Sequence, residues 1–376
     1  MNSGNSIWER IKDPEKGAFI IAGINSNYIQ TKEAKLVEEY LSNAEKLVDL
    51  AIDAGVDAVK FQTHHVEDEQ LNLDTKIPFF DNVDRYEWAD FNTKLAPVGD
   101  FWLPLKRYCD NKGVTFMSTP MSRGAARILN EEVGVEVWKI GSPDILDFVM
   151  LDYLRSTGKP LLMSTGMSTL EETEKTINFL REKNDKLAIL HAISKSPCPP
   201  NELNLKTIDF YKERLDIPVG FSDHSIGIKS ALTAVAMGAR VIEKSFSLSR
   251  DLWGPSHKSS LDHYELTNLI KEIRFFEKDR SQKESILKNE YATRSMGDKE
   301  KVLQREEVEA RPIMRRALVA CQDIPAGTEI TKEMLYAMRP QGYINGLPSE
   351  MYVEVLGKLT KKDYKKYDPI DETILE

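Results

Sequence analysis

The sequence predicts an α/β protein: a (β/α)8 barrel followed by a small, mostly-β C-terminal module. Short apolar or β-branched runs alternate with helical stretches through the first two thirds of the 376 residues, and this alternation is typical of parallel strands joined by crossover helices. Eight such units fit into about 250 residues, the usual size of a (β/α)8 barrel. The rest of the chain is long enough for a second, smaller domain.

The expected strands are short runs bounded by turn residues. In chain order they begin near Phe19, Ala58, Thr115, Val137, Pro160, Leu187, Pro218 and Arg240. The first crossover shows why helices are expected between them, because apolar residues recur there at helical spacing: Val37, Leu41, Ala44, Val48 and Ala51. Thr31 is a candidate N-cap for this helix, and Gly55 lies just past its end.

The barrel is expected to end before a strongly charged segment, residues 278–311, which has few apolar residues in register and is typical of a linker or a surface helix. Beyond it, residues 316–320 are expected to form a strand, residues 324–328 a turn, and residues 338–340 the end of another short element. We therefore place the barrel at residues 1–280, the linker at 281–311 and the module at 312–376.

Composition excludes several classes of function. The net charge of -9 gives no overall attraction to nucleic acid or acidic membranes, so an anionic ligand needs a local basic pocket. The three cysteines, Cys109, Cys198 and Cys321, suggest no disulfide framework and fit a reducing cytoplasm. No apolar run is long enough to cross a bilayer, and residues 1–13 lack an apolar signal core. We expect a cytoplasmic protein.

Chemically active side chains gather where the predicted strands end, and the active sites of this fold lie at that face. Lys60 and Lys139, together with strand-end hydroxyls, would form a cradle for a carboxylate and a phosphate. Any one hydroxyl could equally satisfy a turn, but lysine is seldom buried without a partner. His191, which ends the sixth strand, is expected to be a packed histidine rather than a ligand.

Five of these segments resemble, in the same order, signatures of the sialic acid synthase family. They are residues 59–63 (VKFQT), 116–120 (FMSTP), 138–142 (WKIGS), 163–167 (MSTGM) and 220–224 (GFSDH). The C-terminal module is similar to the antifreeze-like (SAF) domain of that family, whose Arg-Pro pair is matched by Arg339-Pro340. The resemblance spans nearly the whole chain.

The resemblance implies condensation of phosphoenolpyruvate with an N-acyl amino sugar aldehyde, giving a nonulosonate-type 3-deoxy-2-keto sugar acid and phosphate. Lys60, Lys139 and Glu243 are the implied catalytic residues. The implied phosphoenolpyruvate-binding positions are Lys60, Thr119, Lys139, Ser142, Ser164, Ser194 and Ser222. Gln62, Asp144 and Arg339 would bind the acceptor sugar. The arginine would act in trans, within a homodimer whose SAF domain lies over the partner barrel.

The resemblance also implies a divalent cation, Mn or Mg, that polarises the aldehyde. Relatives hold it with two histidines. His224 matches the first, but Ser245 stands in place of the second, and a serine hydroxyl is a poorer ligand than imidazole. His257 or Glu243 could substitute. Asp223 could orient His224 or cap the following helix.

Three interpretations stay open. The chain is a synthase with an unusual acceptor and a weakened metal site, a metal-independent synthase whose protein donors polarise the carbonyl, or an inactive homologue that binds a sugar or phosphoenolpyruvate or partners an active subunit. Ile21, Ser196 and Ser256 stand where relatives carry glutamate, tyrosine and aspartate at acceptor positions. The acceptor therefore stays unnamed.

Overall fold

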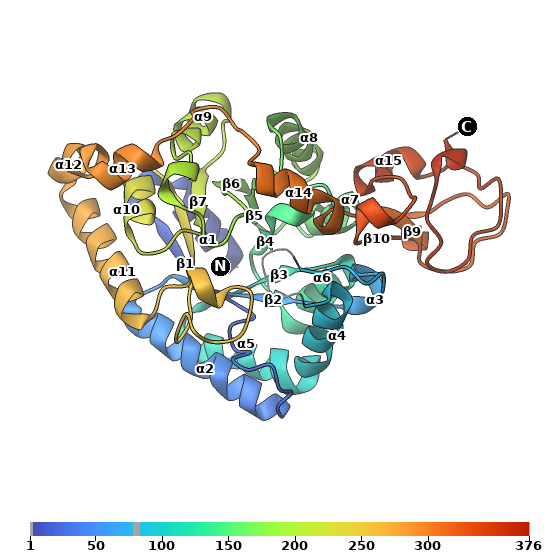
Figure 1. Ribbon diagram of the computed structural model, residues 1–376, viewed down its shortest axis with the longest axis horizontal. Helices are drawn as coiled ribbons and strands as arrows, with labels where there is room; N and C mark the ends of the chain where they lie inside the picture. The colour runs from blue at the N-terminus through green and yellow to red at the C-terminus, as the bar shows by residue number, and fades with distance from the viewer. Residues whose placement is uncertain (1–2, 78–82, 376) are drawn as a thin grey trace.

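A computed structural model gives the fold over residues 3–77 and 83–375. Within these residues, eight parallel strands close into a barrel in sequential order (Figure 1). They are β1 (Phe19–Asn25), β2 (Ala58–Thr63), β3 (Thr115–Pro120), β4 (Trp138–Ile140), β5 (Leu161–Ser164), β6 (Leu187–His191), β7 (Val219–Asp223) and β8 (Val241–Ser245). Each begins within one residue of its expected start, so the predicted barrel is confirmed.

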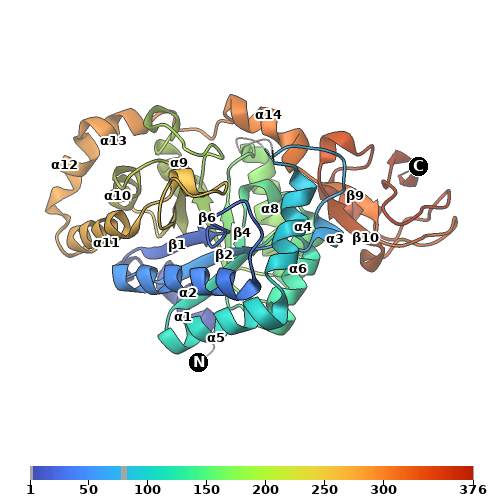
Figure 2. The same ribbon diagram turned by 60° about the horizontal axis from the view of Figure 1, so that its bottom comes forward.

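Helices follow the strands and cover the outside of the barrel, as α2 and α5 show in Figure 2. The longer ones are α2 (Val37–Ala54), α4 (Arg85–Leu95), α5 (Leu103–Lys112), α7 (Phe148–Ser156), α8 (Leu170–Arg181), α9 (Lys206–Arg214), α10 (Lys229–Ala236) and α11 (His263–Lys278). Shorter helices are α3 (Val66–Glu69) and α6 (Arg123–Arg127), and π-helical turns cover Val98–Trp102 and Ile128–Val133.

Helix α2 tests the helical periodicity. Its buried face includes Ala44, Val48 and Ala51, as expected, and Gly55 ends it in the left-handed conformation at φ 93°. The expectation that Thr31 is its N-cap is wrong. The helix begins at Val37 with Leu36 at the N-cap, and the Thr31 hydroxyl instead donates to the carbonyl of Glu33.

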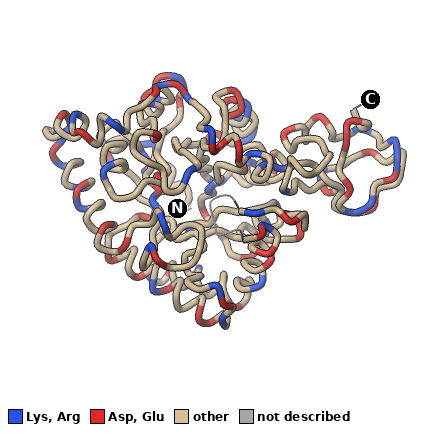
Figure 3. The backbone as a smooth tube through the Cα atoms, in the orientation of Figure 1, with Lys and Arg blue, Asp and Glu red and all other residues tan. Residues whose placement is uncertain are grey.

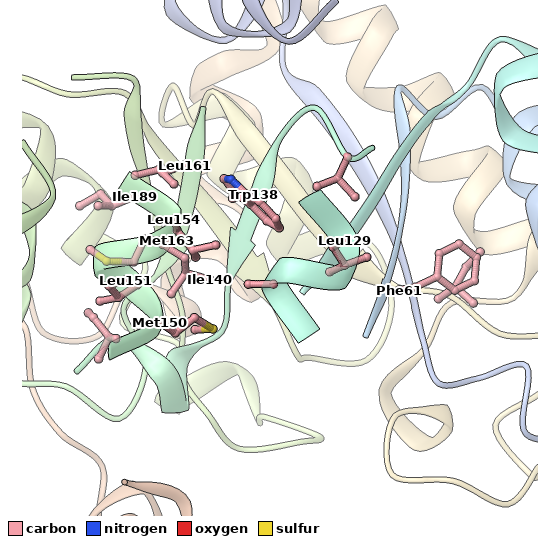
Figure 4. Packing of buried hydrophobic residues seen from close by; sticks show 14 of the residues in the cluster. Phe61, Leu129, Trp138, Ile140, Met150, Leu151, Leu154, Leu161, Met163 and Ile189 are labelled. Atoms are coloured by element: carbon pink, nitrogen blue, oxygen red, sulfur yellow. The ribbon is translucent and has the colours of Figure 1, made fainter. Parts of the chain in front are cut away.

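The main core lies between the strands and their helices. Figure 4 shows Trp138, Ile140, Leu161 and Met163 of neighbouring strands packed with side chains of α7, and each of these strand residues is fully buried. Burying one such side chain contributes about 1.5–3 kcal/mol. This packing fixes the positions of the strand ends that carry the polar residues.

The amino-terminal end of the barrel is closed by helix α1 (Ser3–Lys12). Ile7, Trp8 and Ile11 of this helix share a buried cluster with side chains from the starts of the strands, including Phe19 and Ile21. Because this end is filled with apolar side chains, polar groups collect at the opposite, carboxyl end.

The charged segment after the barrel forms helices α12 (Lys283–Lys288), α13 (Glu290–Ser295) and α14 (Arg305–Met314). Helix α14 leads into β9 (Ala317–Ala320), which pairs antiparallel with β10 (Leu335–Met338). With α15 (Tyr352–Val355) these strands form the C-terminal module, which lies beside α7 in Figure 1. Strand β10 contacts α3 and α7 of the barrel.

Charged residues of both signs are interspersed along the outer helices (Figure 3). Among the described residues, no helix combines the length and apolar character needed to span a membrane.

Candidate active site

A cavity of about 240 Å³ opens at the carboxyl ends of the barrel strands. Most of the residues predicted from the sequence line it: Lys60, Gln62, Thr119, Lys139, Ser142, Ser164, Ser194, Ser222, His224, Glu243 and Ser245. They come from different strands and are brought together because parallel strands of a closed barrel all end at one face.

The Glu243 carboxylate lies between the two lysines of the cavity. Its Oε1 is 2.8 Å from Lys60 Nζ, and its Oε2 is 3.4 Å from Lys139 Nζ. Ser222 donates to Oε2 at 3.0 Å, and Lys139 donates to Ser164 Oγ at 2.7 Å. The site therefore holds two positive charges and one negative charge at the floor of an open cavity.

Burial and neighbouring charges shift the pKa values of Glu243 and Lys139 in opposite directions. Burial alone would raise the pKa of Glu243, but Lys139 and Lys60 outweigh it and hold that pKa well below its usual range. Burial lowers the pKa of Lys139, while the Glu243 carboxylate opposes the shift. Glu243 is thus an anion at neutral pH.

Asn25, at the end of β1, was missed as a site residue. Its Oδ1 accepts a hydrogen bond from Lys60, and its Nδ2 lies 3.4 Å from Ser245 Oγ. Its backbone is left-handed at φ 56°, a conformation that asparagine tolerates better than most residues. Its polar side chain at the end of the first strand is the signal that could have drawn attention to it.

Three strand-end loops meet tightly on the other side of the cavity. The Gly166 N–H donates to Ser142 Oγ at 3.1 Å. A Cβ at Gly166 would lie only 2.2 Å from Ser194 Oγ and 2.7 Å from Ser142 Oγ, so a side chain does not fit there. Ser142 and Ser194 can approach each other only across a glycine.

Comparison with known proteins agrees with this geometry. Residues 47–285 match the NeuB family, and residues 315–373 match the SAF domain. The chain belongs to the NeuB family. As in other proteins of this fold, its polar cavity lies at the carboxyl face of the barrel.

Several named proteins are similar to this NeuB-family chain. N,N'-diacetyllegionaminic acid synthase of Campylobacter jejuni is 33% identical, over 88% of this chain and 95% of that protein. Pseudaminic acid synthase of the same species is 30% identical, over 95% and 96%. The solved structure of spore coat polysaccharide biosynthesis protein SpsE from Bacillus subtilis is 26% identical and superposes with a TM-score of 0.73, covering 94% of each chain.

The donors at the expected metal position of this family member do not fit a cation held by several protein ligands. His224 donates through Nδ1 to the Ile193 carbonyl at 2.8 Å, which leaves the lone pair on Nε2. Burial lowers the pKa of His224, so the ring is neutral. The nearby Glu243 is engaged by lysines, and no group of three or more His, Cys, Asp or Glu residues suited to a metal occurs in the described part of the chain.

His257 does not supply the missing donor. It is fully buried outside the cavity lining, with Nδ1 2.6 Å from Ser247 Oγ and Nε2 2.9 Å from the Ile29 carbonyl. Both ring nitrogens are therefore engaged. For His257 to replace the second histidine, as the sequence suggested, the ring would have to give up one of these two contacts.

Asp144 and Arg339 do not line the cavity. Arg339 belongs to the C-terminal module yet is fully buried, pairing with Asp144 and lying 3.8 Å from Glu69 of the same chain. Arg316 holds the same Asp144 oxygen at 3.0 Å. These residues dock the module onto its own barrel, whereas the sequence led us to expect Arg339 at a partner's sugar site.

The contacts of Asp223 and His191 indicate what each side chain does. Asp223 pairs with Lys244 at 2.9 Å and accepts from Ser225 and Ser230, so it fixes the turn after β7 rather than orienting His224. His191 is fully buried and bonded to the Leu203 carbonyl at 2.8 Å, as a packed histidine should be.

Proposed function

We propose that this protein condenses phosphoenolpyruvate with an N-acyl amino sugar aldehyde, giving a nonulosonate-type 3-deoxy-2-keto acid and phosphate. The supporting observation is the pair of buried lysines, Lys60 and Lys139, in a cavity lined with hydroxyl groups. The names of the relatives, which are synthases of legionaminic and pseudaminic acids, support the same reaction class.

In this proposal the lysines bind the phosphate and carboxylate of phosphoenolpyruvate, with Ser142, Ser164 and Ser194 as hydrogen-bond donors. C3 of phosphoenolpyruvate attacks the aldehyde carbon, whose oxygen takes up one proton of the water that the reaction consumes, while the other proton of that water leaves on phosphate. Water adds at C2, and phosphate leaves with cleavage of the C–O bond. Fixed positive charge stabilises the anion as it departs, and the ionised Glu243 can orient the attacking water by accepting a hydrogen bond from it.

The polarisation of the aldehyde falls to protein donors in this scheme. The described side chains do not form a multidentate cation site, so we assign no step to Mn or Mg. Gln62 lines the cavity beside Lys60 and is the acceptor-side residue that we carry forward. The metal requirement is open to direct assay.

The test is to incubate the purified protein with phosphoenolpyruvate and a panel of N-acyl amino sugars and to measure phosphate. Parallel reactions contain Mn or a chelator. We expect phosphate release that depends on both substrates and persists in the chelator. No release with any acceptor would contradict the proposed catalysis.

A second candidate function, ligand binding without turnover, is favoured by Ser245 and by the altered acceptor positions. Phosphoenolpyruvate at one hundred times its Kd should stabilise the native protein by about 2.7 kcal/mol. A raised Tm without phosphate release would support this second candidate. No shift at millimolar phosphoenolpyruvate would contradict both functions.

The homodimer is a separate part of the proposal. It is tested by light scattering after size-exclusion chromatography. A monomer that retains activity would show that the contact of the SAF module with its own barrel is sufficient.

A further inference from the structure

Met167, in the loop after β5, has a strained backbone. Its φ of 55° is left-handed, which is costly for a residue with a long side chain, on the order of 1 kcal/mol or more. The residue lines the cavity and directly follows Gly166, whose N–H binds Ser142. Its backbone therefore continues directly from the residue that binds the Ser142 hydroxyl.

The contacts that hold Met167 come from α14, the helix between the two domains. The Met167 N–H donates to Glu307 Oε1 at 2.9 Å. Its carbonyl accepts from Arg311 at 3.1 Å and also from Arg315. Arg315 reaches the Pro143 carbonyl in the β4 loop as well, at 3.3 Å.

Glu307 joins this loop to the next one. The same Oε1 accepts from the Ser194 N–H at 2.7 Å, while Oε2 accepts from the N–H of Gln304 at 3.1 Å. The carboxylate is fully buried and thus binds backbone from the β5 loop, the β6 loop and the start of α14 together. The ammonium group of Lys301 is buried, and the Glu307 carboxylate opposes the burial that lowers the pKa of Lys301.

We infer that α14 is part of the active site and that Glu307 is a positioning residue, which holds Met167 and Ser194 so that the hydroxyls of Ser142 and Ser194 converge on the phosphoenolpyruvate phosphate. This inference rests on the proposed function. Glu307 touches neither the cavity nor a substrate, and it acts through the two loops. At the end of the same helix, Met314 lines the cavity directly.

The test compares Glu307→Ala with Glu309→Ala in the full chain. Glu309 lies two residues away on α14, is exposed and pairs only with Arg305 among the described contacts. We expect Glu307→Ala to raise the Kd and KM for phosphoenolpyruvate at least tenfold while kcat changes less than threefold. Glu309→Ala should change each less than twofold. Simple loss of folded protein would instead lower kcat and leave KM unchanged.

A second pair of variants tests the strain. Glycine adopts the left-handed conformation readily, so Met167→Gly should shrink the effect of Glu307→Ala on phosphoenolpyruvate affinity. Glu307→Gln keeps an acceptor oxygen and should lose less than Glu307→Ala. Equal losses in the wild-type and Met167→Gly backgrounds, or an unchanged Kd in folded Glu307→Ala, would overturn the inference.

The experiment can also be read if Glu307→Ala does not fold, and it distinguishes failure of this inference from failure of the proposed function. If Glu307→Ala does not fold, the comparison of Glu307→Gln with Glu309→Gln decides, because both keep side-chain length, and equal affinities would overturn the inference. Amide hydrogen exchange over residues 164–168 and 192–196 should accelerate only in the Glu307 variant. If the wild-type protein does not bind phosphoenolpyruvate, the proposed function has failed, whereas wild-type binding with no Glu307 effect removes only the positioning role.

Discussion

Two buried carboxylates in this molecule are each held by a pair of cations. Glu243 lies between Lys60 and Lys139 in the cavity, and Asp144 lies between Arg316 and Arg339 where the module meets the barrel. The arginines also bind backbone carbonyls, among them those of Ala337 and Met314. The lysines face open space lined with hydroxyls.

The difference shows how one electrostatic motif serves two purposes. A guanidinium is a rigid fork, and Arg316 and Arg339 direct most of their donors at carboxylates and backbone carbonyls, whereas an ammonium is a point charge that can turn to a new partner. The arginine pair is sealed and suits docking. The lysine pair can exchange its partner for a ligand.

The largest expected effect on activity comes from removing one of the two cavity lysines, Lys60 and Lys139. Lys139→Met keeps most of the side-chain volume but removes the charge that, in the proposed reaction, faces phosphate. We expect a loss of roughly a thousandfold in kcat/KM, as for removal of a preorganised donor, with a smaller fall in Tm than for Asp144→Ala because Glu243 keeps Lys60 at 2.8 Å. Steady-state phosphate release and calorimetry measure these. A loss below tenfold would show that the lysines do not hold the reacting anion.

Removing the carboxylate between Arg316 and Arg339 should instead lower the free energy of unfolding. Asp144→Ala removes the carboxylate that Arg316 and Arg339 share and leaves Arg316 with Asp147 at 3.1 Å and Arg339 with Glu69 at 3.8 Å. Removing one partner of a buried ion pair costs about 3–5 kcal/mol, and we expect a loss at the lower end of that range. Urea unfolding monitored by tryptophan fluorescence measures the free energy of unfolding. A stable Asp144→Ala protein with impaired phosphoenolpyruvate affinity would mean that Asp144 serves the cavity rather than the docking.

His191 is a fully buried side chain that carries no charge in the folded protein at neutral pH. Burial, with a contribution from Lys301, lowers the pKa of His191 to about 3, while the unfolded chain takes up a proton near pH 6.5. The unfolded state therefore binds more protons between these values, and stability falls as pH drops from 6.5 toward 3, by up to about 1.4 kcal/mol per unit. In His191→Gln this slope should decrease by up to that amount. An identical slope in both proteins would place the titration elsewhere.

The smallest expected effect is a gain in Mn affinity at the cavity. Ser245→His restores a second imidazole near His224, and Mn affinity should rise by roughly tenfold because imidazole is the better ligand. Titration calorimetry with Mn measures it, and Ser281→His, at an exposed position outside the cavity lining, is the control. Equal affinity in wild type and Ser245→His would mean that any cation binds elsewhere.

The fold was predictable from the sequence because strands and crossover helices leave periodic apolar signals, and strand ends locate the cavity. Lys60, Lys139 and Glu243 followed from that rule. Asp144 and Arg339 did not, because their partners depend on how the module docks, which no local pattern encodes. Glu307 was hidden for the same reason: it lies in a charged segment that predicted only a linker or surface helix.

Glu243 also influences which anions the cavity can bind. The two ammonium groups carry one more charge than the resident carboxylate, so a singly charged ion such as chloride or acetate can balance the excess but cannot also take the place of Glu243. A ligand that carries both a phosphate and a carboxylate brings enough charge to compete with that resident anion. We therefore expect the cavity to favour anions of higher valence over monovalent ones.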